Sequence, residues 1–244
     1  MRRGNRPPLV GGSSPEKDPA GIPAVLERVY SRLYQEYGPQ HWWPGDGPLD
    51  VVIGAILTQS AAWANVELAL ANLKAARCWS VGAIHGKPQD ELAAIIRPSG
   101  YFNAKARKLK AFASHVVSNY GGDLDRFLGL AMTPLREELL SIHGIGPETA
   151  DDIILYAAEK PSFVIDAYTR RIVGRLGIAP EGMPETYDGH KSLFQRHLPP
   201  DTAMFNEYHA LLDRHAKETC AKAPRCAGCC LLEMCATGNP AARS

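Results

Sequence analysis

The sequence lacks any long uninterrupted apolar run. Its first eighteen residues are rich in Arg, Gly, Pro and Ser and contain no apolar stretch of the kind found in signal peptides. No later stretch approaches the length of a membrane span. We therefore expect a disordered tail over residues 1–18, followed by an intracellular, cytoplasmic chain that does not contact a membrane.

The sequence also has little excess charge. The 27 Lys and Arg residues nearly balance the 26 Asp and Glu residues, so the formal net charge is +1 and does not indicate nucleic acid. A DNA-binding surface would have to gather basic residues locally. Between Glu91 and Asp123 there is no acidic residue, and this stretch contains Lys105 and Arg107 among other basic residues. We expect Lys105 and Arg107 to face DNA, and a solvated helix face is the alternative interpretation.

The sequence also lacks paired segments of alternating apolar and polar residues that a tight turn would join as two strands. Apolar residues recur at helical spacing instead, as in the segment from Leu26 to Leu33. Breakers such as Pro98-Ser99-Gly100 and Pro199-Pro200 separate the helical segments. The pattern predicts an all-α protein of about ten short helices, in one large domain or two intimate ones.

Cysteine is unevenly distributed. Cys78 stands alone, whereas the other five of the six cysteines lie between residues 220 and 235. Four of them are separated by five, two and five residues, namely Cys220, Cys226, Cys229 and Cys235. Cys230 directly follows Cys229, which makes it a poor ligand for the same site. Four thiolates suit either tetrahedral zinc or a [4Fe–4S] cluster, and the spacing does not decide between them.

The segment 135–157 predicts two helices joined by a short turn. The first helix has one apolar stripe at Leu135, Leu139 and Ile142. It stops at Gly144-Ile145-Gly146, and Pro147 suits the first turn of the second helix. The glycines permit positive φ and expose backbone N–H groups, which together with a helix N-terminus suit a DNA phosphate. By itself the pattern also fits an ordinary glycine-rich turn.

The segment after this hairpin makes the pattern specific. Phe163 to Ile178 reads FVIDAYTRRIVGRLGI, in which apolar residues and an Asp precede a basic helix expected at Ala167–Leu176. In this order the motifs resemble the endonuclease III superfamily of helix-hairpin-helix DNA glycosylases, from about Pro23 to Cys235. The resemblance implies two helical lobes with a DNA groove between them. One lobe would comprise residues 40–160, and the other residues 19–39 with 161–244.

The same resemblance assigns the cysteines. The sequence TCAKAPRCAGCCLLEMC resembles the loop that closes the endonuclease III family, which implies a [4Fe–4S] cluster at Cys220, Cys226, Cys229 and Cys235, with zinc as the alternative. The first interval departs from the family, because it is five residues here and usually six there.

The resemblance implies that Asp166 is the catalytic carboxylate. A carboxylate can stabilise the oxocarbenium character that develops on a sugar when its N-glycosidic bond breaks, and it can activate water. Asp166 also stands where a helix begins, so a plain N-cap is the alternative interpretation, and the two roles are compatible.

A lysine is absent from one informative position. The bifunctional enzymes of the family carry it two residues after the second hairpin glycine, where its amine forms a Schiff base with the sugar. Here Glu148 occupies that position, and a carboxylate cannot form an imine. We therefore expect a monofunctional enzyme that uses water and leaves an abasic site. Glu148 itself is interpreted as a first-turn helix acid.

Tryptophans indicate the base that is removed. The stretch HWWPGDGPLDVVIGAILTQSAAW resembles the 3-methyladenine glycosylase branch and supplies Trp42, Trp43, Pro44 and Trp63 as a base pocket. Indole faces attract the positive charge of an alkylated base, although tryptophans are also common in cores. Trp79 has no motif around it and is expected in the core. The resemblance gives Gln59 the role of filling the gap left by the flipped base.

The expected partner is double-stranded DNA with a damaged base, bound by a nucleoid-associated monomer that works in base excision repair. Two alternatives stay open from the sequence. One is an endonuclease III-like enzyme for oxidised pyrimidines, and the other is a non-catalytic protein that binds lesions.

Overall fold

The computed structural model describes residues 21–179, 182–239 and 241. The tail expected over residues 1–18 lies outside this range. Within it there are helices and loops but no β-strand, which confirms the all-α prediction. None of the helices in these ranges has the length and apolarity that a membrane crossing requires.

The helices are more numerous, and some are longer, than the sequence indicated, with α6 reaching 19 residues. The α-helices are α1 (Gly21–Tyr37), α2 (Pro48–Leu57), α3 (Trp63–Ala75), α4 (Val81–Gly86), α5 (Gln89–Ile95), α6 (Phe102–Tyr120), α7 (Leu124–Leu128), α8 (Met132–Ser141), α9 (Pro147–Asp152), α10 (Ala167–Leu176), α11 (Tyr187–Gln195) and α12 (Thr202–Glu218). Short 3₁₀ turns occur at Arg97–Ser99 and Leu232–Met234, and a π-helical turn at Ile153–Ala157.

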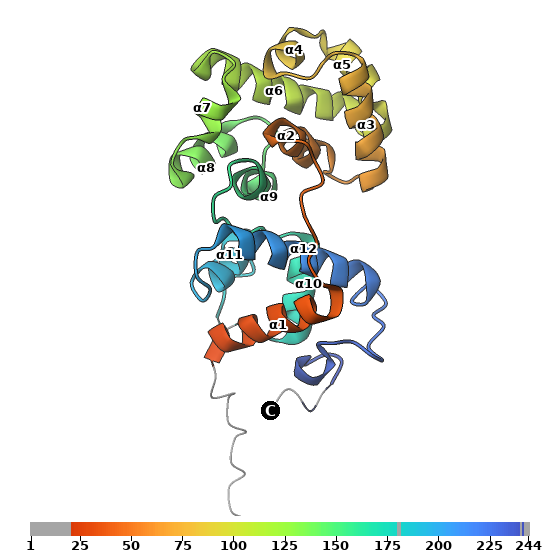
Figure 1. Cartoon of the computed structure of the whole chain (residues 1–244), viewed down its shortest axis with the longest axis vertical. Helices are drawn as coiled ribbons and strands as arrows, with labels where there is room; N and C mark the ends of the chain where they lie inside the picture. The colour runs from red at the N-terminus through yellow and green to blue at the C-terminus, as the bar shows by residue number, and fades with distance from the viewer. Residues whose placement is uncertain (1–20, 180–181, 240, 242–244) are drawn as a thin grey trace, which may run out of the picture.

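The helices form two groups along the long axis of the molecule (Figure 1). Helices α2 to α9 make up the upper group in this view, and α1, α10, α11 and α12 the lower one. The chain begins in the lower group, crosses to the upper one after α1 and returns after the π-helical turn. Helix α12 packs against both α1 and α10, and it also contacts the π-helical turn, which joins the two groups.

The hairpin forms as its sequence predicts. Leu135, Leu139 and Ile142 are buried, so α8 presents one apolar stripe to the core. Gly144 has a φ of 86°, in the left-handed region that favours glycine. A β-carbon there would also collide with the Lys108 side chain. Pro147 is the first residue of α9, where its missing N–H leaves no helical bond unmade.

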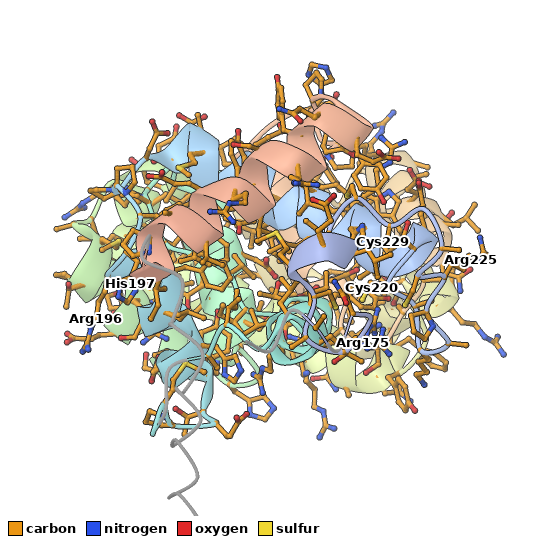
Figure 2. The ribbon with its side chains drawn as sticks, turned by 90° about the horizontal axis from the view of Figure 1, so that it is seen from below. Arg175, Arg196, His197, Cys220, Arg225 and Cys229 are labelled. Carbon is orange, nitrogen blue, oxygen red and sulfur yellow. The ribbon has the colours of Figure 1, made fainter. Side chains whose placement is uncertain are left out.

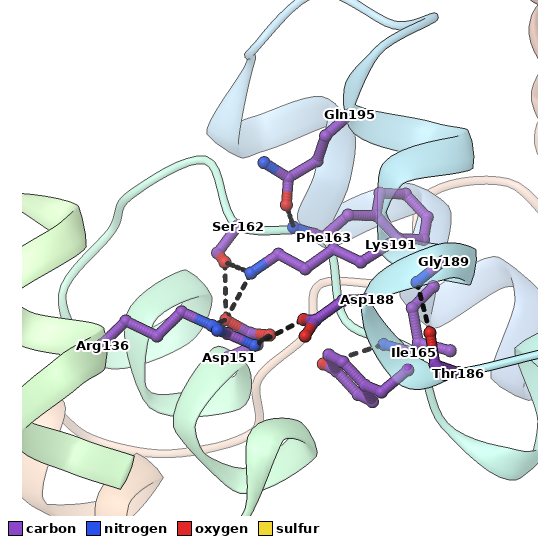
Figure 3. A network of polar contacts seen from close by, with 11 residues as sticks. Arg136, Asp151, Ser162, Phe163, Ile165, Thr186, Asp188, Gly189, Lys191 and Gln195 are labelled. Atoms are coloured by element: carbon purple, nitrogen blue, oxygen red, sulfur yellow. Dashed lines mark hydrogen bonds and ion pairs between the residues drawn. The ribbon is translucent and has the colours of Figure 1, made fainter. Parts of the chain in front are cut away.

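A buried polar network ties the hairpin to the lower group (Figure 3). Asp151 of α9 is fully buried and accepts from Arg136 of α8 at 3.1 Å and from Lys191 of α11 at 2.7 Å. The Ser162 hydroxyl also donates a hydrogen bond to Asp151, at 2.8 Å. A buried carboxylate is tolerated only when its charge is paired and its lone pairs accept hydrogen bonds, as they do here.

The segment between the hairpin and α10 has no regular secondary structure and uses side chains as hydrogen-bond partners (Figure 3). The Phe163 N–H donates to Gln195 and the Ile165 N–H donates to the Tyr187 hydroxyl, both at 3.3 Å. Phe163, Val164 and Ile165 are themselves buried. These contacts fix the position of Asp166, the next residue in the chain.

Candidate active site

Asp166 caps the N-terminus of α10. Its Oδ1 accepts from the Thr169 N–H at 2.6 Å, and its side chain keeps 17% of its surface exposed. The predicted helix bounds Ala167–Leu176 and the cap are therefore confirmed. The unpaired amides of the first turn favour a negative charge at this position.

Two further acids on the hairpin face the same region. Glu148 is exposed to solvent, but it lies in a concave pocket with protein on several sides. Desolvation by those surroundings, and then the charge of Asp166, raise the pKa of Glu148, while Arg170 opposes the shift. Asp152 is buried, and its pKa is raised well above the usual value by burial first, then by the charges of Glu148 and Asp166. Burial therefore disfavours the charged form of Asp152 beside the other two carboxyl groups, Glu148 and Asp166.

Two residues that the sequence did not single out, His209 and Tyr156, lie beside these acids. Tyr156, from the π-helical turn, and His209, from α12, are both buried, and the Tyr156 hydroxyl lies 2.5 Å from His209 Nδ1. His209 Nε2 lies 3.9 Å from Asp166 Oδ2. No sequence signal distinguished them, because a single histidine or tyrosine on an apolar helix face is usually part of the core.

Trp43 is the centre of an aromatic cluster. Its ring centroid lies 5.4 Å from that of Trp63, 5.8 Å from Trp42 and 5.3 Å from Tyr156. It packs onto α2 at Gly54, where a β-carbon would lie 3.0 Å from the indole. The structure thus brings the three predicted tryptophans together and links them to Asp166 through Tyr156 and His209.

Trp42, Pro44 and Trp79 differ from Trp43 in their surroundings. Lys217 places its ammonium 5.9 Å from the ring centroid of Trp42, so one face of this indole already meets a cation. Pro44 is exposed and lines a separate hollow that it shares with Trp63. Trp79 is half-buried and packs against the core, with Lys74 over its ring at 4.6 Å.

Two larger hollows flank these groups. The first, of about 490 Å³, lies between the hairpin and α10 and is lined by residues that include Gln59, Gly146, Glu148 and Arg170. The second, of about 520 Å³, is lined by Trp42, Trp43 and Tyr156 together with residues of α12. Both hollows draw on the upper and the lower group of helices.

Gln59 is held by the hairpin. Its amide nitrogen donates to the Thr149 hydroxyl at 2.9 Å and to the Gly144 carbonyl at 3.3 Å, and its oxygen accepts from Lys108. A contact between Gln59 and an orphaned base stays a prediction, and it would require this amide to give up some of these bonds.

The conformation of the hairpin turn leaves fewer residues for the predicted phosphate contact than the sequence indicated. Only Gly144 has a positive φ, because Gly146 has a φ of −94° and is extended. Ile145 is 5% exposed, and its N–H donates to the Ile142 carbonyl at 3.1 Å. Ile145 therefore supports the turn and offers no group to a phosphate, so the predicted contact is narrowed to Gly144, Gly146 and the first turn of α9.

Lys105 was wrongly predicted to face DNA. It is 2% exposed, and its ammonium donates to the Leu57 carbonyl at 2.8 Å and to the Ser99 carbonyl at 2.6 Å. Burial and the nearby Lys108 lower the pKa of Lys105. It joins the end of α2 to the turn before α6. Arg107 is exposed on α6, and its contact with DNA stays a prediction.

The four predicted cysteine ligands line one small cavity, and Cys230 is not among the lining residues. A β-carbon at Gly238 would lie 3.5 Å from Cys226 Sγ and 3.6 Å from Cys235 Sγ, so these sulfurs converge on one glycine. The pKa of the Cys229 thiol is raised mainly by burial, and the other three cysteines add to the shift.

Arg175 of α10 organises the start of this loop. Figure 2 shows it beside Cys220, with Cys229 close by. Its guanidinium donates to Cys220 Sγ at 3.2 Å and to the Ala221 carbonyl at 2.7 Å. No three His, Cys, Asp or Glu side chains in the described ranges meet at the spacing of a single-ion site. The donor set, four thiols around one cavity with N–H groups directed at sulfur, fits a thiolate-bound iron–sulfur cluster.

The fold and the site define a helix-hairpin-helix protein in which the Asp166 carboxylate lies close to Glu148, a residue that lines the hollow between the hairpin and α10. The family described as HhH-GPD superfamily base excision DNA repair protein matches residues 53–200, more than half of the chain. A protein of Methanocaldococcus jannaschii named as a DNA repair glycosylase is 42% identical over 218 residues, which cover 86% of this chain and 96% of that protein. This chain therefore belongs to the HhH-GPD superfamily and is a DNA glycosylase of base excision repair.

Solved structures agree with this assignment. The 3-methyladenine DNA glycosylase of H. pylori, bound to 1,N6-ethenoadenine, superposes with a TM-score of 0.70 at 25% identity, over 81% of this chain and 98% of that one. A non-covalent endonuclease III–DNA complex superposes with a TM-score of 0.76 at 19% identity, over 91% of this chain and 99% of the enzyme, which shows the shared fold.

Proposed function

We propose that this protein is a monofunctional DNA glycosylase, which hydrolyses the N-glycosidic bond of an alkylated, 3-methyladenine-type base flipped out of duplex DNA. The observation that carries the proposal is the Asp166 carboxylate close to Glu148, which stands at the hairpin position where a Schiff-base enzyme needs a lysine. Water, activated near Asp166, is then the nucleophile.

In this mechanism Asp166 acts electrostatically. Its Oδ1 is held by the Thr169 N–H, so the carboxylate has a fixed orientation before DNA arrives. As the bond to the base lengthens, positive charge grows on the sugar, and a preorganised carboxylate stabilises that charge without reorganising. The same carboxylate can orient the water that attacks the anomeric carbon.

The preference for a cationic base rests on the aromatic cluster around Trp43. Indole faces attract cations, and a base alkylated on a ring nitrogen carries positive charge that an oxidised pyrimidine lacks. The likeness to the 3-methyladenine enzyme of H. pylori supports this choice. An alkylated base is also a good leaving group, so the site needs no strong general acid.

We further propose that a [4Fe–4S] cluster is held by four cysteines, Cys220, Cys226, Cys229 and Cys235. Cys230, the fifth cysteine of the loop, is not a ligand. Such a cluster would serve as a structural and redox-active centre. Around it, the protein supplies Arg175 to fix the loop at Cys220 and the Gly238 N–H, which donates to Cys235 Sγ at 3.3 Å.

A base-release screen tests the function. Duplexes that carry N-alkylated purines, thymine glycol or uracil are incubated with excess enzyme, and free base and strand breaks are measured. We expect the alkylated purine to be released fastest, with strand breaks only after alkali and no adduct trapped by borohydride. Fastest release of thymine glycol would support an endonuclease III-like enzyme. A strong trapped band would refute hydrolysis by water, and binding without release would indicate a lesion-binding protein.

Substitution of Trp43 tests the base pocket. Stacking on one aromatic side chain contributes about 1–3 kcal/mol per base, so Trp43→Ala should slow release of a cationic base about 10- to 100-fold. Duplex affinity should change less than about threefold, because phosphate contacts dominate it. Trp79→Ala is the matched control, since Trp79 is equally a half-buried indole but lies outside the cluster. Equal losses in release and in duplex binding would count against the pocket.

A further inference from the structure

His209 is a buried polar group beside Asp166 that the mechanism does not yet use. It is 7% exposed, and no atom in the described part of the structure forms a hydrogen bond with its Nε2. Nε2 lies 3.9 Å from Asp166 Oδ2, beyond the roughly 2.7–3.2 Å of an N–H···O bond but directly beside it. An unpaired buried N–H is costly, so this donor has a structural reason to seek the carboxylate.

Tyr156 determines which nitrogen of His209 carries the proton. Burial raises the pKa of Tyr156 well above its usual value and lowers that of His209, so both are neutral near pH 7. The Tyr156 hydroxyl lies 2.5 Å from Nδ1 and can donate to it. Nε2 then carries the hydrogen. The opposite tautomer would direct the Nε2 lone pair at a carboxylate oxygen, which is repulsive.

The two oxygens of Asp166 face different groups. Oδ1 is bound by the Thr169 N–H at 2.6 Å, and Oδ2 is beside the His209 Nε2–H. A bond from His209 in addition to the one from Thr169 would hold the carboxylate from two elements, the first turn of α10 and the middle of α12, and would limit its rotation. Its remaining lone pairs are available for water and for the sugar.

We propose that His209 is a positioning residue for Asp166, whose Nε2–H donates to Oδ2 in the working complex, and that Tyr156 selects the tautomer that allows it. This inference rests on the proposed function, because it takes Asp166 as the catalytic carboxylate.

Other charged groups near His209 also influence the pH dependence of the site. Asp213 and Lys217 lie on the same helix, and they form an ion pair with each other at 2.7 Å. Asp166, at the start of α10, and Tyr156, in the π-helical turn, lie beside His209. Asp152 is close enough to Tyr156 to raise its pKa. Substitution of His209 or Tyr156 leaves Asp213, Lys217 and Asp152 in place, so a change in pH dependence reports on the His209–Asp166 contact.

The test compares His209→Phe, His209→Gln and Tyr156→Phe in single-turnover release of an alkylated purine between about pH 5 and 9. A hydrogen bond to a charged group contributes enough for a loss of about 10- to 100-fold in His209→Phe. The acid limb of the profile should move to higher pH, because a donor that favours the ionised carboxylate is gone. Gln places an amide N–H near the position of Nε2 and should restore much of the rate. Tyr156→Phe should show a smaller loss, with the same shift.

Thermal melting and duplex binding are measured for each variant, and we expect duplex affinity within about threefold of wild type. A wild-type rate and profile in His209→Phe would overturn the inference, as would a loss that is equal at every pH. If His209→Phe does not fold, Tyr156→Phe decides the test. An acid limb at the wild-type pH in Tyr156→Phe would then overturn the inference. Normal release by Asp166→Asn would instead refute the proposed function, whatever His209 does.

Discussion

Asp166→Asn should abolish base release while the protein still folds and binds duplex DNA. Removing a preorganised charge from the developing oxocarbenium ion costs about 10²- to 10⁴-fold in rate. Asparagine is as good an N-cap as aspartate, and its side-chain oxygen can still accept from the Thr169 N–H. The melting temperature should therefore stay within about 2 °C of wild type. Single-turnover release and a melting curve on the same preparation measure both effects.

Asp123→Asn is the matched control for this experiment. Asp123 caps α7 by accepting from the Arg126 N–H at 2.9 Å, and it is exposed in the upper group of helices. The substitution changes the same functional group at the same kind of position, but away from the candidate active site. We expect wild-type release from Asp123→Asn. If the two variants release base equally well, the role of Asp166 is that of a cap alone.

Cys229→Ser should remove most of the iron that the purified protein carries. The wild-type protein should be brown, absorb near about 400 nm and contain about four irons per chain, as a [4Fe–4S] cluster does. Serine is a poor ligand for this cluster, and the loop of fourteen residues between the first and last cysteine would lose its anchor. Absorbance, iron content and melting temperature should all fall, and each is measured without an activity assay.

Cys230→Ser is an unusually close control, because it changes the neighbouring residue in the same loop. Burial raises the pKa of the Cys230 thiol to about 11, and its carbonyl accepts a hydrogen bond from Arg32 at 3.3 Å. Its side chain does not line the cavity of the other four cysteines. Iron content should be unchanged in Cys230→Ser. A colourless wild-type protein that contains zinc would contradict the cluster, and equal iron loss in both variants would contradict the ligand assignment.

Local signals determined several parts of this protein from the sequence alone. The bounds of α10 and its cap at Asp166 follow from an N-cap residue before a periodic segment, and both are found as predicted. The hairpin follows from an apolar stripe, a glycine that needs positive φ and a proline at N1. The gathering of four cysteines around one cavity follows from their close spacing. Each of these features lies within a few turns of chain, where steric and hydrogen-bonding preferences act directly.

Only the tertiary structure decided the surroundings of these elements. Lys105 lies in a basic run, yet packing buries it between two backbone carbonyls from other segments. His209 and Tyr156 meet across 53 residues of sequence, and nothing near either residue indicates that contact. The reason is physical: such contacts depend on how whole helices pack, and packing is fixed by the shape of the complete core and not by any one stretch of chain.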